Sequence, residues 1–160
     1  MKFILLLVFV LSNAFANSAL LAEYPETPDR ILTPGSLCNE PDSYRYPEAI
    51  PYCERDHLGS AVKDQVMQEY RNKGYQLDPS KRSSYKMDHM IPLCAGGSNN
   101  ANNLWPQHKN IFILTDPIEP LGCKKLEAGK ITQANLVRLI IIAKTNLSRV
   151  REVLAYLQSL

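Results

Sequence analysis

Residues 85–110, which read YKMDHMIPLCAGGSNNANNLWPQHKN, contain two short apolar pieces separated by a long polar loop. The apolar pieces, residues 85–93 and 104–107, have the length of short strands. Residues 95–103 between them are rich in Gly and Asn, which is the composition of a loop. A helix is expected to begin near His108, so the segment predicts two strands followed by a helix.

The regions around this segment complete the prediction of a single α+β domain. Apolar residues spaced by three and four positions predict a helix over residues 60–73 and a helical region over residues 132–160, with a break near Asn146. Six prolines in residues 17–58 exclude long helices and central strands, so an extended strap is expected there. Residues 117–130 hold two prolines and two glycines and are expected to form a connection.

The first sixteen residues differ from the rest of the chain. Lys2 precedes an unbroken apolar run, residues 3–11, and an A-F-A triplet ends at Ala16. This order is typical of a secretory signal peptide, residues 1–16, that is cut after Ala16. The apolar run is shorter than the roughly 20 residues that span a bilayer, which disfavours the alternative of a membrane anchor. We therefore expect a secreted or periplasmic protein with no stable membrane association after cleavage.

The chain has four cysteines, an even number that suggests disulfides in an exported protein. Of the three possible pairings we favour Cys38–Cys53 with Cys94–Cys123, because each closes a moderate loop and neither crosses the other. A zinc site is the alternative, and it is disfavoured because no C-x-x-C pair occurs and the spacings are long.

The residues able to do chemistry also gather in residues 85–110. Two of the three histidines, His89 and His108, lie there, whereas His57 stands apart and is expected on the surface or at a helix cap. Phosphodiester hydrolysis needs a base that works near neutral pH, which suits His, and a divalent cation that neutralises the phosphate. Adjacent residues such as Asp88 and His89 point to opposite faces of a strand, so one shared site requires a kink.

Three motifs in this segment resemble the HNH endonuclease family, and in particular its small exported branch. They are D-H-x-I-P-L from Asp88, G-G-x-N from Gly96 and N-L-W-P-Q from Asn103. The resemblance implies an α+β fold with a ββα-metal core, flanked here by helices and the strap and stapled by disulfides. It implies His89 as general base, Asp88 as a metal ligand, and Asn103 as the residue that braces the loop and orients His89.

The third position of the family motif is a metal ligand at the start of the helix. Asn110 is the preferred candidate, although it follows Asn103 by a shorter interval than usual in the family, and His108 is its competitor. Oxygen ligands suit Mg²⁺, the expected ion, while a His108 ligand would favour Zn²⁺, and Mn²⁺ is a further alternative.

Substrate binding would depend on local clusters of cations, because the formal net charge is only +2. Arg82, Lys86 and Lys109, with Lys81 beside them, bracket the motif and could hold phosphates without reading bases. A second cluster, expected to contribute less, comprises Lys124, Lys125 and Lys130.

Together these observations predict an exported, metal-dependent HNH endonuclease of low sequence specificity. Residues 17–58 would form its strap, and residues 59–160 its nuclease domain with a C-terminal helical region. DNA is preferred over RNA as substrate, and any inhibitor protein is left open. The alternatives are a catalytically inactive nucleic-acid-binding module and a disulfide-stabilised secreted interaction protein.

Overall fold

The computed structural model describes residues 22–55 and 58–160. The expected signal peptide, residues 1–16, and the interpretation of His57 therefore lie outside the described residues. Within the described part of the chain, no helix is both long and apolar enough to cross a membrane.

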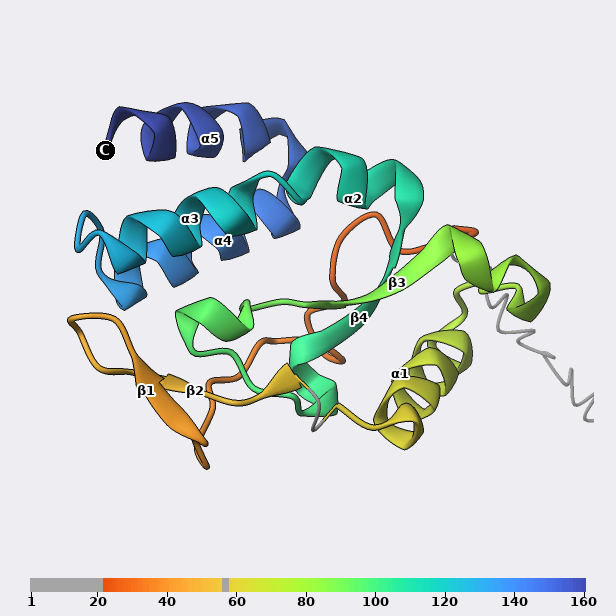
Figure 1. Cartoon of the computed structure of the whole chain (residues 1–160). Coiled ribbons are helices and arrows are strands. Elements are labelled where there is room, and N and C mark those ends of the chain that lie inside the picture. The colour runs from red at the N-terminus through yellow and green to blue at the C-terminus, as the bar shows by residue number, and fades with distance from the viewer. Residues whose placement is uncertain (1–21, 56–57) are drawn as a thin grey trace, which may run out of the picture.

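The described residues form an α+β fold, as predicted (Figure 1). One antiparallel hairpin pairs β1 (Ser43–Arg45) with β2 (Ile50–Tyr52), and another pairs β3 (Tyr85–His89) with β4 (Leu104–His108). The helices are α1 (Ser60–Lys73), α2 (Lys109–Thr115), α3 (Ile118–Glu127), α4 (Gln133–Thr145) and α5 (Val150–Ser159).

The predicted order of two strands and a helix is confirmed by β3, β4 and α2. The first strand ends at His89 rather than at residue 93, because Pro92 cannot donate to a ladder and residues 93–95 form a helical turn. At the far end, the His108 side chain caps α2 by accepting a hydrogen bond from Asn110 N at 3.3 Å. This bond helps to set the start of α2 at Lys109.

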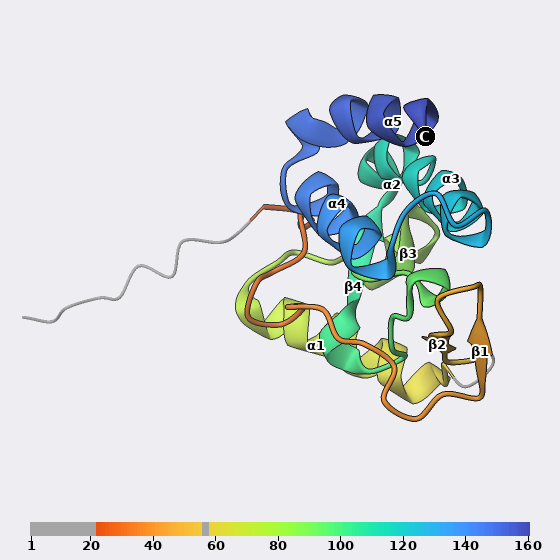
Figure 2. The same ribbon diagram turned by 90° about the vertical axis from the view of Figure 1, so that its left-hand side faces the viewer.

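Two hydrophobic cores lie on opposite sides of the β3–β4 hairpin. Figures 1 and 2 show α3, α4 and α5 together on one side and α1 on the other. The first core joins the three helices to residues 90–95, and the second joins α1 to β4. The most deeply buried residues of the second core are Val66, Tyr70, Leu104 and Trp105. The hairpin therefore lies between two layers: α1 packs against β4, and the three helices pack against the residues that follow β3.

The helices at 60–73 and 132–160 are confirmed, and so is the break near Asn146, which caps the turn that follows α4. The expectation that residues 117–130 only connect is wrong, because α3 occupies most of them. Pro120 lies in the first turn of α3, where a missing N–H costs no helical bond. Gly122 is required by packing, since a Cβ there would lie 2.5 Å from Leu136 Cδ1.

Both predicted disulfides are present, Cys38–Cys53 and Cys94–Cys123, with Cα–Cα separations of 5.9 and 5.8 Å. The first closes a loop within the strap that contains β1 and β2, and the second ties α3 to the turn after β3. The described residues of the strap contain no α-helix, as predicted, and consist of turns, bends and the β1–β2 hairpin. It runs beside the loop that joins β3 to β4, where Cys38 N donates to Gly96 O at 2.8 Å.

Candidate active site

The strand β3 ends in a cavity of about 430 Å³ that Asp88 and His89 both line. Because His89 is the last residue of the strand, the backbone leaves the pleat there and the two side chains can reach one space. The other charged residues that line the cavity are Arg55, Lys86, Asp116 and Glu119. The kink that the sequence required for a shared site is thus supplied by the end of the strand.

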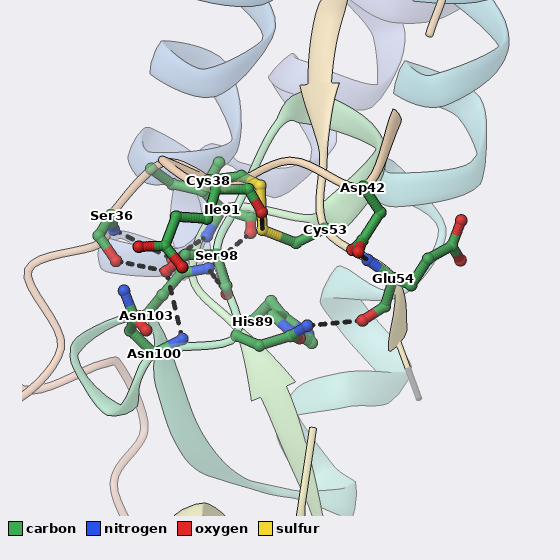
Figure 3. The surroundings of a disulfide bond; sticks show 12 residues. Ser36, Cys38, Asp42, Cys53, Glu54, His89, Ile91, Ser98, Asn100 and Asn103 are labelled. Atoms are coloured by element: carbon green, nitrogen blue, oxygen red, sulfur yellow. Dashed lines mark hydrogen bonds between the residues drawn. A yellow bond between two sulfur atoms is a disulfide. The ribbon is translucent and has the colours of Figure 1, made fainter. Parts of the chain in front are cut away.

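Asn103 braces the loop that follows His89. Its side chain is fully buried, and its Oδ1 accepts hydrogen bonds from Ile91 N at 2.9 Å and Ser36 N at 3.3 Å. Its Nδ2 donates to Ile91 O at 3.0 Å and to Ser98 O at 2.8 Å. Figure 3 shows this network beside the Cys38–Cys53 disulfide. The loop packs so closely that a Cβ on Gly97 would lie 1.7 Å from Ile91 O.

Asn99, rather than Asn103, contacts the His89 ring directly. Asn99 Nδ2 donates to Glu54 O at 2.7 Å, which turns its Oδ1 toward His89 Nε2 at 3.0 Å. An amide oxygen only accepts, so Nε2 carries the proton and Nδ1 keeps its lone pair. Burial lowers the pKa of His89, and the bond to Asn99 offsets this only in part. His89 is therefore held as a neutral imidazole with one nitrogen able to accept a proton.

Asp88 is buried, with 6% of its surface exposed, and its carboxylate is held by three side chains. Lys144 Nζ lies 2.5 Å from Oδ2, Trp105 Nε1 donates to the same oxygen at 3.2 Å, and Lys86 Nζ lies 3.3 Å from Oδ1. Burial alone would raise the pKa of Asp88, but the charges of Lys144 and Lys86 outweigh it and lower that pKa. Asp88 is therefore an ionised carboxylate inside the protein.

Lys144 was not anticipated as part of the site. It comes from α4, is only 4% exposed, and also donates to His89 O at 2.5 Å. Its Nζ therefore ties the end of β3 to the helical layer. A signal existed in the sequence, since Lys144 follows Leu136 and Ile140 at four-residue intervals on the buried face of α4. A lysine on such a stripe needs a buried anionic partner.

Glu119 and Asp116 are further acidic residues of the cavity that sequence reasoning missed. Burial raises the pKa of Glu119, with Lys144 lowering it and Asp88 raising it again. Asp116 is about half exposed and pairs with Lys86. Glu119 precedes Cys123 by one helical turn on the same face, and Cys123 is bonded to the turn after His89. The predicted disulfide was thus the signal that could have located Glu119.

The structure does not bring Asn110 or His108 into this cavity. The antiparallel register pairs His108 with Tyr85 and His89 with Leu104, so the two histidines lie at opposite ends of the hairpin. Four residue steps separate these ends, about 13 Å at the usual rise of a strand. The expected grouping of either residue with Asp88 at one ion is therefore not assembled.

His108 and Asn110 have other contacts. The His108 ring stacks on Tyr24 with centroids 3.8 Å apart and meets Tyr85 edge-on at 5.2 Å. Asn110 Nδ2 donates to the Tyr24 hydroxyl at 3.1 Å. Burial and the nearby charge of Lys109 lower the pKa of His108. These residues hold the strap against the hairpin.

Of the cations predicted to bind substrate, only Lys86 lines the cavity. Lys81 pairs with Glu23 at 2.9 Å, and Arg82 lies 3.9 Å from Asp64. Lys109 is exposed at the start of α2, beside His108. The predicted cluster is therefore spread along the hairpin rather than gathered at His89.

The donors around the cavity fit a divalent ion in their chemistry. Asp88 and Glu119 supply carboxylate oxygens and His89 an imidazole nitrogen, and the raised pKa of Glu119 marks a carboxyl that a nearby cation would help to ionise. In the described residues, no three His, Cys, Asp or Glu side chains are already grouped as a metal site. Lys144 and Lys86 partly neutralise the acids instead.

Comparisons of the chain with protein-family models, with curated proteins and with solved structures find no match.

Proposed function

We propose that the protein is a metal-dependent endonuclease that hydrolyses phosphodiester bonds of nucleic acid, with DNA preferred over RNA. The observation that carries this proposal is His89, a buried neutral imidazole whose tautomer is set by Asn99 and whose ring lines a charged cavity. The sequence resemblance to HNH endonucleases supports the same assignment, as does the order of β3, β4 and α2.

In this proposal His89 is the general base. Its Nδ1 accepts a proton from a water molecule, which then attacks phosphorus. The bond from Nε2 to Asn99 orients the ring and places the proton of the neutral imidazole on Nε2, which leaves Nδ1 with a lone pair. Burial lowers the pKa of His89 and so favours this neutral form. The Asn103 network holds the loop that carries Asn99, so Asn103 acts by positioning.

Two cations of the cavity wall, Lys86 and Arg55, are suited to bind the non-bridging oxygens of the phosphate. Lys86 already lies between two carboxylates, those of Asp88 and Asp116. A phosphate oxygen entering beside it would compete with Asp116, the more exposed of its two partners. Binding of the substrate would therefore rearrange this outer pair and leave the buried pair of Asp88 and Lys144 in place.

Asp88 and Glu119 are the residues that would hold a divalent ion, with Mg²⁺ expected and Mn²⁺ or Zn²⁺ as alternatives. Such an ion would stabilise the charge that develops on the phosphate and on the leaving oxygen. Glu119 has here the role of metal ligand for which the sequence pattern favours Asn110 or His108. Burial raises the pKa of Glu119, and the charge of a bound ion would act in the opposite direction and favour the ionised carboxylate.

An inactive nucleic-acid-binding module is the second candidate, and the buried pair of Asp88 and Lys144 favours it. An ammonium group already neutralises the carboxylate that the family resemblance assigns to the metal. Such a module would bind nucleic acid and release no product.

The test is cleavage of plasmid DNA, single-stranded DNA and RNA by the oxidised protein with Mg²⁺, Mn²⁺, Zn²⁺ or EDTA. His89→Ala is the informative variant, and His108→Ala is its matched control at the other end of the hairpin. Loss of a general base is expected to slow cleavage by roughly 10²–10⁴-fold in His89→Ala, while His108→Ala keeps most of the activity. Cleavage that persists in EDTA, or that His89→Ala leaves unchanged, would overturn the proposal.

A further inference from the structure

A second hollow, of about 310 Å³, lies between α1 and the start of β3. Its charged lining holds four cations and two acids: Lys63, Arg71, Arg82 and Lys86, with Asp64 and Asp78. Its apolar lining comprises Met67, Tyr85 and Met87, which are all partly buried. This α1–β3 hollow therefore combines an excess of positive charge with apolar surface.

Several of these cationic side chains are available to bind an anion. Lys63 forms no ion pair with a described residue, and Arg82 has only a long contact of 3.9 Å with the exposed Asp64. Arg71 is oriented by one bond, from its Nε to Leu77 O at 3.2 Å, and that bond leaves its terminal nitrogens available. Asp78, by contrast, is satisfied by Ser80 N at 2.8 Å and Ser80 Oγ at 2.7 Å.

The α1–β3 hollow and the His89 cavity are neighbours along one strand. Lys86 and Met87 line both of them, and among the described residues β3 is paired on one edge only, with β4. The path from Tyr85 to His89 is about 13 Å long, which is enough for a short stretch of sugar–phosphate backbone. A chain laid along the free edge of β3 would pass from one hollow into the other.

We propose that the α1–β3 hollow binds the sugar–phosphate backbone of a single nucleic-acid strand beside the bond that is cut. The inference rests on the proposed nuclease function and names the form of its substrate. Cations in a groove track a backbone without reading sequence, and apolar side chains pack against sugars or bases. The small volume admits one strand at a time, so a duplex would touch only the rim.

The test measures binding of a fluorescent single-stranded oligonucleotide by anisotropy, in EDTA and over a series of salt concentrations. The double variant Lys63→Gln with Arg82→Gln should bind about tenfold more weakly. The slope of log K against log salt concentration should also become smaller in magnitude by about 1.4, because each lost phosphate contact to a single strand contributes ~0.7. Arg138→Gln with Arg151→Gln removes the same charge from α4 and α5 and should bind like the wild type. Asp64→Asn removes an acid from the hollow and should bind more tightly.

Equal effects of the two double variants, or no effect of either, would overturn the inference. Tighter binding of a duplex than of a single strand would also overturn it. Displacement of the strand by polyglutamate of matched charge would overturn it too, because that result would indicate an acidic protein partner. Thermal unfolding of each variant checks that the fold is intact. Failure of the nuclease function is seen separately: the wild type would then bind the strand through the hollow yet cleave no nucleic acid with any metal.

Discussion

The two ends of the β3–β4 hairpin carry similar residues and differ in their surroundings. At one end His89 is held by Asn99 and faces a cavity that contains Asp88, Lys86 and Glu119. At the other end His108 caps α2, beside Asn110, and stacks on Tyr24. A histidine with a nearby asparagine is therefore no evidence of a site by itself. The cavity and its buried charges distinguish the first end from the second.

The largest effect on stability is expected from the buried ion pair at the His89 end. Lys144→Met leaves Asp88 without its main partner, and breaking a buried pair in this way costs about 3–5 kcal/mol of unfolding free energy. Lys109→Met, at the His108 end, removes an exposed charge and should change stability by no more than about 0.5 kcal/mol. Urea unfolding measures both. Similar values for the two variants would show that Lys144 is not needed to hold Asp88.

The double variant Asp88→Asn with Lys144→Met sharpens the same comparison. Removing both charges should restore part of the stability that Lys144→Met loses, because no uncompensated carboxylate then remains buried. A strictly additive result would mean that the two residues do not interact.

A smaller loss is expected from Asn103→Ala, which removes a fully buried side chain with four hydrogen bonds to the backbone. Leaving buried backbone groups unpaired costs about 1–3 kcal/mol. The matched change at the other end, Asn110→Ala, removes one exposed contact to the Tyr24 hydroxyl and should cost about 0.5 kcal/mol or less. Thermal unfolding distinguishes the two. Asn103→Ala should also slow cleavage, since the loop that carries Asn99 would be loosened.

The subtlest expectation is the pH dependence of cleavage. Burial lowers the pKa of His89 below its ordinary value of 6.5, and the base must be neutral to accept a proton. Activity should therefore persist as the pH falls through 6.5 and be lost only below it. The acidic limb of the pH profile of kcat/KM should be the same in the His108→Ala variant, because His108 lies outside the cavity. A limb above 6.5, or one that moves in His108→Ala, would contradict the role of His89.

The sequence predicted the local parts of the molecule well. Strand, loop, strand and helix in residues 85–110 follow from apolar pieces and Gly- and Asn-rich loop composition, and the structure contains them in that order. Both disulfides were predicted from spacing. The helix α3 was missed because Pro120 and Gly122 read as breakers, although one lies in the first turn and the other packs against Leu136.

The site was predicted only in part. Asp88, His89 and Asn103 are adjacent to the hairpin loop, so motif and local geometry place them together. The third motif position, a metal ligand, is predicted near the start of α2, whereas the structure places Asn110 and His108 at the opposite end of the hairpin and Glu119 in the cavity. Sequence distance from Asn103 does not reveal this separation, because the antiparallel register decides which residues of the hairpin lie side by side.

The amino-acid sequence was sufficient for features that neighbouring residues determine: secondary structure from apolar periodicity, the hairpin from its loop, and the disulfides from loop closure. Which distant side chains meet at His89 was decided only by the tertiary structure. Lys144 reaches Asp88 from α4, Glu119 reaches the cavity through the Cys94–Cys123 bond, and Glu54 orients Asn99 from the strap. These contacts depend on how packed layers fit around the hairpin, and no local pattern of residues encodes that fit.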